Sequence, residues 1–127
     1  MTTIDEPRRS TFYRCFVRDQ AKCRYCGKDL LASYDSFAAS CLDHLKPACA
    51  TGAHEDEWNR VTAGAVCNHL KGRFDPLPDG AVTPATFETC VERAREHIAE
   101  KRSGTRDNSY YRDYLDWLKE FDRTALA

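Results

Sequence analysis

Three short stretches of this chain indicate its fold and its candidate site: LDHLKP at residues 42–47, WNRV at 58–61 and CNHLKG at 67–72. They place a His next to an Asp, an Asn sixteen residues after that Asp, and another Asn nine residues later. A His can take a proton from water because its ordinary pKa lies near neutrality. Carboxylate and amide oxygens bind hard divalent cations, and such a cation can stabilise the charge that develops on a phosphate. The pattern therefore predicts a one-metal phosphodiesterase site.

The sequence around these stretches predicts a strand, a loop, a second strand and a helix, in that order. Residues 36–45 are small and apolar enough for a strand that ends at the Asp-His pair, and a proline at position 47 stops it. Residues 48–57 have the composition of a loop, 58–62 read as the second strand, and 63–74 as a helix that ends near Gly72. In such a ββα hairpin the motif residues converge on one spot.

Helices are predicted on both sides of this hairpin. A short helix covers about residues 10–22, with Ser10 as its candidate N-cap, and a CRYCG turn follows in which Gly27 is available for a positive φ. The fold class is therefore predicted to be α+β, with this N-terminal helix and two C-terminal helices flanking the small ββα core.

The first C-terminal helix is predicted to start at Thr83-Pro84 and to end at about residue 102. Its buried face follows the three-to-four spacing and comprises Phe87, Val91, Ala94 and Ile98. The second covers about residues 109–123. Its Tyr-rich side is interpreted as a packing face, with a base-stacking platform or an oligomer interface as the alternatives.

Composition and charge limit the class of protein. A chain of 127 residues with 42% hydrophobic residues has the size and the apolar content of one domain. The net charge is -1 overall, but it is +2 over residues 1–73 and -3 over residues 74–127, so modest, salt-sensitive affinity for nucleic acid is expected. The sequence shows no apolar run of membrane-spanning length and no signal-peptide pattern, so no membrane partner and a cytoplasmic location are expected.

The stretch from about Phe16 to Phe74 resembles the HNH endonuclease family, which has the ββα-metal (His-Me finger) fold. The resemblance rests on CRYCGKDL at residues 23–30, on LDHLKP, on WNRV and on VCNHLKG at residues 66–72. The length of the chain indicates a single domain over residues 1–127, and the resemblance implies an HNH core at about 10–74 that includes the CRYCG turn as a metal knuckle, followed by a helical extension at about 83–127. It also implies hydrolysis of phosphodiester bonds in DNA, double-stranded DNA being favoured and RNA staying open.

The resemblance also implies a role for each matching residue. His44 would be the general base, and Asn59 would hold the loop that carries it and orient the imidazole. Asp43 and Asn68 would bind the catalytic divalent cation, Mg²⁺ or Mn²⁺. Lys71 would lie close to the phosphate. His69 is not part of the resemblance: next to Asn68 on the predicted helix it faces about 100° away, so a solvent-facing role or a contact with the nucleic-acid phosphate is expected. The oligomeric state stays open, with a homodimer as one option.

The cysteines match the family only in part. Many of its members bind a structural zinc through two C-x-x-C pairs, and this chain has the first pair as Cys23 and Cys26. Of the second pair only Cys67 is present, because the position three residues before it is Gly64. A tetrahedral zinc site takes four ligands. Either the zinc is lost and the thiols are packed as a remnant, or a fourth ligand comes from elsewhere, with these candidates: Cys41, Cys49, His54 and His69.

A catalytically inactive nucleic-acid-binding module, or a structural zinc-knuckle domain on the same scaffold, is the alternative function. The missing cysteine and the weak net charge favour this alternative. The presence of His44 together with both cation ligands favours the endonuclease.

Overall fold

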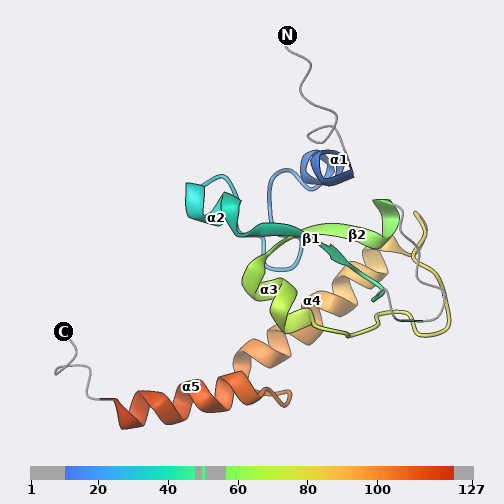
Figure 1. The fold of residues 1–127 in the computed structure, drawn as a ribbon. Coiled ribbons are helices and arrows are strands. Elements are labelled where there is room, and N and C mark those ends of the chain that lie inside the picture. Colours follow the sequence, from blue (N-terminus) through green and yellow to red (C-terminus); the bar gives the residue numbers. More distant parts are fainter. Residues whose placement is uncertain (1–10, 48–49, 51–56, 122–127) are drawn as a thin grey trace.

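The structure, a computed structural model, describes residues 11–47, 50 and 57–121. It is an α+β fold in which a two-stranded antiparallel hairpin has an N-terminal helix and several helices that follow it (Figure 1). The helices are α1 (Thr11–Arg18), α2 (Tyr34–Ala38), α3 (Ala65–Lys71), α4 (Phe87–Ser103) and α5 (Ser109–Glu120). The strands are β1 (Ser40–His44) and β2 (Arg60–Gly64), and a short 3-10 helix, η2 (Glu57–Asn59), leads into β2.

The hairpin is covered on both of its faces. In its register Ser40 lies opposite Gly64 and His44 lies opposite Arg60. The helix α1 packs on one face, whereas α3 lies on the other with α4 packed against it (Figure 1). Successive residues of a strand point to opposite faces, and residues 61–63 are all buried because neither face is open. The end of the hairpin that carries the motif is thus held between helices.

The core lies between the hairpin, α3 and α4. The prediction that α4 buries a face at the three-to-four spacing is confirmed, because all four of its predicted residues are buried. The buried apolar cluster comprises Cys23, Tyr25, Leu30, Leu45, Val61, Ala63, Cys67, Leu70, Val82, Phe87, Cys90, Val91, Ala94 and Ile98. Cys23 and Tyr25 of the CRYCG turn thus belong to the same core as the hairpin. None of the described helices is both long and apolar enough to cross a membrane.

The strand predicted over residues 36–45 is wrong at its start, because β1 begins only at Ser40. The residues before it form α2. Ser33 caps this helix, since its hydroxyl oxygen accepts a hydrogen bond from the backbone N–H of Ser36 at 3.0 Å. This local hydrogen bond offers the backbone an alternative to the strand that the apolar composition suggested.

The second strand and the helix after it are shifted from their predicted bounds. The strand predicted over 58–62 begins at Arg60, because the chain first makes the turn η2. The helix predicted over 63–74 is α3, which is shorter at both ends. Its end at Gly72 is confirmed, and this residue has a φ of 53°, a conformation that glycine adopts at little cost. The positive φ predicted for Gly27 is likewise confirmed at 79°.

The outer helices differ from the predictions at their starts and ends. The helix α1 ends at Arg18, well before residue 22, and the residues Gln20 and Ala21 that follow it have positive φ values of 59° and 57°. Its predicted N-cap, Ser10, lies outside the described residues. The helix α4 begins at Phe87 rather than at residue 84. In front of it, residues 83 and 86 form a separate turn in which each backbone N–H donates to the hydroxyl of the other threonine, at 2.8 and 3.3 Å.

The prediction that the last helix packs on the domain is wrong. No residue of α5 is buried in the part of the chain that the structure describes. The helix leaves the far end of α4 and runs away from the hairpin (Figure 1). Its large side chains Tyr110, Tyr114, Trp117 and the adjacent Phe121 are each more than half exposed. The oligomer interface and the base-stacking platform stay predictions.

His97 on α4 is buried in an apolar setting. Its ring stacks on that of Phe74 with the centroids 4.2 Å apart, and its Nδ1 has no hydrogen-bond partner among the described residues. Burial, and then the charges of Lys101 and Arg106, lower the pKa of His97 to about 4, against the opposing effect of Glu100. The folded state therefore favours the neutral imidazole.

This setting predicts a stability that falls in acid. The unfolded chain binds a proton at His97 below pH 6.5, whereas the folded chain does so only below about 4. The contribution of the neutral His97 to the free energy of unfolding is thus fully present above the unfolded pKa. As the pH falls toward the folded pKa, this contribution is lost, and the free energy of unfolding declines by on the order of 2 to 3 kcal/mol. Urea unfolding between about pH 7 and pH 5 should show a shallower decline for His97→Gln than for the wild type. The exposed His69→Gln should keep the wild-type decline, and an unchanged decline in His97→Gln would contradict the assignment.

Candidate functional site

The carboxylate of Asp43, near the end of β1, is enclosed by side chains from two other segments. The hydroxyl of Tyr25, in the CRYCG turn, donates to its Oδ2 at 2.5 Å. The ammonium of Lys71, on α3, lies 3.7 Å from the same oxygen. Burial raises the pKa of Asp43, while Lys71 and then Tyr25 act to lower it. The carboxylate is therefore held in position by one cation and one neutral donor.

Lys71 lies in the interior. The residue is 1% exposed, and its Nζ donates to the backbone carbonyl of His44 at 2.7 Å. Burial lowers the pKa of Lys71, and the neighbouring carboxylate of Asp43 opposes that effect. The resemblance implies a contact between this ammonium and a phosphate, which needs a surface position. The structure instead places the ammonium where it joins α3 to the Asp43-His44 pair.

Asn59, at the end of η2, binds the backbone just beyond His44. Its Oδ1 accepts the N–H of Lys46 at 2.8 Å, and its Nδ2 donates to the carbonyl of the same residue at 3.0 Å. Its backbone carbonyl accepts the N–H of Leu45 at 2.8 Å. These bonds prolong the pairing of the two chain segments past the last strand residue. Asn59 is therefore placed to hold the backbone that carries His44.

The other motif side chains approach the end of β1 from two sides. Successive strand residues point to opposite faces, so the half-buried His44 lies on the face opposite to that of Asp43 and Cys41. Asn68 is half-buried on α3, one turn before Lys71, and its side chain acts to lower the pKa of Cys41, against burial, which raises it. Asn68 thus comes to the face that carries Asp43, whereas His44 reaches the same strand end from the other face.

His69 has a different setting from its neighbour on α3. It is exposed, and its ring packs edge-on against that of Tyr110, with the centroids 4.7 Å apart. Adjacent helix residues point about 100° apart, so His69 turns away from the strand end. It keeps the surface position that a contact with a nucleic-acid backbone requires.

The thiols of Cys23, Cys26 and Cys67 come together at the opposite end of α3. Their sulfur atoms all lie within 4.8 Å of one another, with Cys23 and Cys67 buried and Cys26 exposed. Thiolate is the ligand that thiophilic ions such as zinc prefer. The predicted grouping of these three cysteines is confirmed, and together they could bind such an ion.

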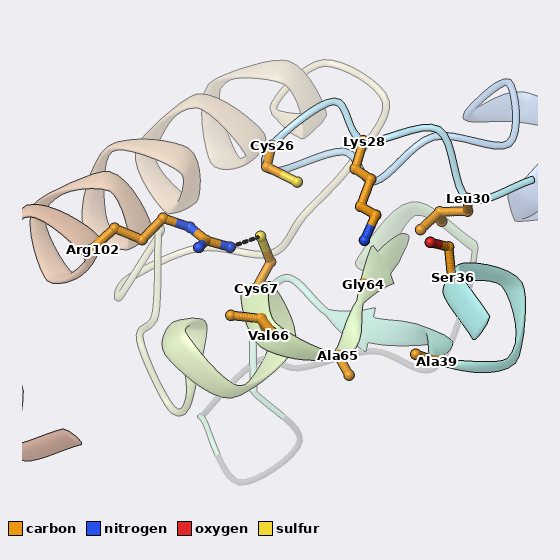
Figure 2. A pocket seen from close by; sticks show the side chains of 10 residues that line it. All are labelled: Cys26, Lys28, Leu30, Ser36, Ala39, Gly64, Ala65, Val66, Cys67 and Arg102. Carbon is orange, nitrogen blue, oxygen red and sulfur yellow. Dashed lines mark hydrogen bonds between the residues drawn. The ribbon is translucent and has the colours of Figure 1, made fainter. Parts of the chain in front are cut away.

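The candidates for a fourth ligand do not complete this cluster. Cys41 and His69 are not part of the group of ligand atoms, and Cys49 and His54 lie outside the described residues. A positively charged side chain, that of an arginine, lies against the cluster instead. Arg102, near the end of α4, points its guanidinium at the cluster and donates from Nη2 to the sulfur of Cys67 at 3.2 Å (Figure 2).

Hydrogen bonds make one sulfur of the cluster acidic. A bond from the Cys67 thiol, together with bonds from the backbone N–H groups of Gly64 and Cys26, lowers the pKa of Cys23 to about 5, against the effect of burial. Donating that bond raises the pKa of Cys67, with burial acting in the same direction and Arg102 against it. These hydrogen bonds therefore act in favour of the thiolate, the form that binds a metal ion, at one sulfur of the cluster.

Two residues of the site escaped the sequence analysis, Tyr25 and Arg102. For Tyr25 a signal was present, because the ring stands between two knuckle cysteines, and a buried tyrosine usually finds a partner for its hydroxyl. For Arg102 there was none. It lies 35 residues after Cys67, and only the packing of α4 on α3 brings them together.

Comparison with known proteins adds no relative. No family model, no curated protein and no solved structure matches the chain. The function is therefore argued from the residues and their geometry.

The contacts of Asn59 predict a large loss of stability on truncation. Asn59→Ala leaves the buried N–H and carbonyl of Lys46 without their partners, so the free energy of unfolding should fall by about 2 to 3 kcal/mol. Urea denaturation monitored by tryptophan fluorescence would measure the loss. The matched variant Asn68→Ala, at a half-buried position, should lose less than about 1 kcal/mol. Equal losses in the two variants would contradict the role assigned to Asn59.

Proposed function

We propose that the chain is a metal-dependent endonuclease of the HNH class that hydrolyses phosphodiester bonds in DNA, with double-stranded DNA as its substrate. In this proposal Asp43 and Asn68 hold one divalent cation, Mg²⁺ or Mn²⁺. His44 is the general base that activates the attacking water. Asn59 fixes the backbone that carries His44, and His69 offers a surface contact to the nucleic acid.

The meeting of the three motif segments at the end of β1 is the observation that carries this proposal. Lys71 of the third segment reaches both members of the Asp43-His44 pair, at 3.7 Å and 2.7 Å. Asn59 of the second segment binds the backbone two residues after His44. Residues that are far apart in the sequence are thus held around one short piece of chain. A chance occurrence of the same letters would not require such contacts.

The ligand atoms that Asp43 and Asn68 offer suit a hard cation. A carboxylate and a primary amide both offer oxygen, which Mg²⁺ and Mn²⁺ prefer. The hydroxyl of Tyr25 donates to Asp43, so it favours the charged carboxylate that a cation needs. Bound there, the cation would stabilise the negative charge that develops on the phosphate and on the leaving oxygen.

The protein groups would divide the remaining work between them. His44 would take a proton from water, and the water oxygen would attack phosphorus while the bond from phosphorus to the 3′ oxygen breaks. The 3′ oxygen would take a proton from solvent to give a 3′-hydroxyl, and the phosphate would stay on the 5′ side. Asn59 limits the positions that His44 can adopt, because the backbone on its C-terminal side is clamped. Lys71 offsets the charge of Asp43 from the protein interior without reaching the substrate.

Removing the general base provides the direct test of the activity. His44→Ala should slow the nicking of supercoiled plasmid by about 10²- to 10⁴-fold in Mg²⁺ or Mn²⁺, since general-base catalysis contributes about that factor. The wild type should show no nicking when the metal is chelated. The measurement is the rate of conversion from supercoiled to nicked plasmid on agarose gels.

His97→Gln, a substitution on α4 away from the motif, is the matched control and should cleave like the wild type near neutral pH. Far-UV circular dichroism and a gel-shift assay should show that His44→Ala keeps the fold and the binding of DNA. Undiminished cleavage by His44→Ala would exclude the mechanism. Failure of the wild type to cut any plasmid, single-stranded DNA or RNA with either metal would favour the inactive binding module.

The hydrogen bond from Tyr25 predicts a second effect on cleavage. Tyr25→Phe keeps the buried ring but removes the donor to Asp43, so the carboxylate is less well fixed for a cation. The Mg²⁺ concentration for half-maximal cleavage should rise by about 10- to 100-fold, the usual effect of losing a partner of a metal ligand. Tyr34→Phe, on the exposed helix α2, is the control and should leave it unchanged. An unaltered Mg²⁺ dependence in Tyr25→Phe would show that the hydroxyl serves stability alone.

A further inference from the structure

The cysteine cluster lacks one of the ligands that a closed metal site would have. Its three sulfur atoms lie close enough together to bind a single ion, and no fourth His, Cys, Asp or Glu belongs to the group within the described ranges. A structural zinc site takes four protein ligands, whereas a site with three protein ligands keeps one position for an exchangeable ligand. The question is whether the surroundings of the cluster provide room for such a ligand.

Gly64 provides that room. It stands three residues before Cys67, and its φ of -77° and ψ of 156° are open to any residue. A Cβ built on it would approach only one described atom, Cδ2 of Leu30, at 3.9 Å. A cavity of about 320 Å³ lies at this point and is lined by Gly64 together with the thiol-bearing residues Cys26 and Cys67 (Figure 2). The side chain that would close the metal site is thus replaced by open space.

Two cations border the same cavity. Lys28 and Arg102 both line it, and they reach it from the loop after the knuckle and from α4 (Figure 2). Arg102 also donates to the sulfur of Cys67 at 3.2 Å. The ammonium of Lys28 forms no ion pair with any carboxylate in the described part of the chain. Three thiolates and a divalent ion carry a net charge of about -1 by ligand chemistry, so these two cations leave the cavity positive.

We propose that Cys23, Cys26 and Cys67 hold a thiophilic divalent ion such as zinc at an open site, whose fourth position faces this cavity and takes a small anionic thiol from solution. A fourth sulfur suits an ion that already has three sulfur ligands. A carboxylate on the incoming thiol would meet Lys28 and Arg102. In the exchange the thiol gives its proton to solvent and its sulfur displaces a water from the ion, with no change in oxidation state. The proposal does not depend on the endonuclease.

Cobalt(II) provides a direct readout of this site, because its visible absorption reports the number of thiolate ligands. The wild type loaded with one Co²⁺ should change its spectrum when mercaptoacetate is added. The neutral 2-mercaptoethanol should need a several-fold higher concentration for the same change. Lys28→Met should remove most of that difference, because it removes one of the cations that recognise the carboxylate.

Gly64→Cys is the matched closed variant. It should bind Co²⁺ with the spectrum of four thiolates, should not respond to mercaptoacetate, and should bind Zn²⁺ more tightly than the wild type in competition with a chromophoric chelator. Arg102→Met should weaken Zn²⁺ binding by about 10- to 100-fold, as expected when a ligand loses its hydrogen-bond partner. Cys67→Ser should lose the ion, whereas Cys90→Ala, a buried cysteine outside the cluster, should keep it.

Two results would overturn the proposal. A wild-type Co²⁺ spectrum that already matches Gly64→Cys and ignores both thiols would mean that the protein closes the site with a ligand of its own. Failure of the wild type to bind Co²⁺ or Zn²⁺, when Gly64→Cys does bind them, would mean that three thiolates are insufficient here. Neither readout uses DNA, so failure of the endonuclease proposal would leave the outcome unaffected.

Discussion

Lys71 carries a positive charge into the protein interior, and the segments around it must compensate for that charge. An isolated buried charge costs several kcal/mol, and removing the partner of a buried ion typically costs about 3 to 5 kcal/mol. The compensation comes from the His44 carbonyl at 2.7 Å and the Asp43 carboxylate at 3.7 Å. Asp43 is itself buried and accepts a hydrogen bond from the hydroxyl of Tyr25, which stands between two residues of the cysteine cluster, Cys23 and Cys26. The helix α3, the strand β1 and the knuckle are therefore coupled, and a displacement of any one of them would disturb the others.

A second buried lysine acts in a similar way on the other side of His44. The Nζ of Lys46 donates to Asp75 at 2.7 Å and to the carbonyl of Leu77 at 2.7 Å, while its backbone is bound by Asn59. The segment between α3 and α4 is thereby tied to the strand end. His44 consequently lies between two anchored positions, Asp43 before it and Lys46 after it. Its half-buried side chain is therefore carried by a backbone with little freedom.

The parts of the structure that depend on local spacing could be predicted from the sequence. The order of strand, strand and helix followed from composition and breakers, whereas most of the loop predicted over residues 48–57 lies outside the described residues. The grouping of Cys23, Cys26 and Cys67 followed from the resemblance. The helix α2 was missed because the cap at Ser33 overrides an apolar composition that favours a strand. The burial of Lys71 was missed because a lysine is normally exposed, and only its partners on β1 reverse that rule. These partners are set by the packing of distant elements, which spacing along the chain does not encode.

The exposure of α5 has a consequence for how the protein loses its structure. Helices of about 12 residues are marginal in water on their own, and this one has 12 residues, none of them buried. It is held mainly by its cap at Asn108 and by the edge contact of Tyr110 with His69. Its backbone amides should therefore exchange their hydrogens through local openings that leave the core closed. Melting of this helix and unfolding of the hairpin then become two separate transitions, each with its own free energy.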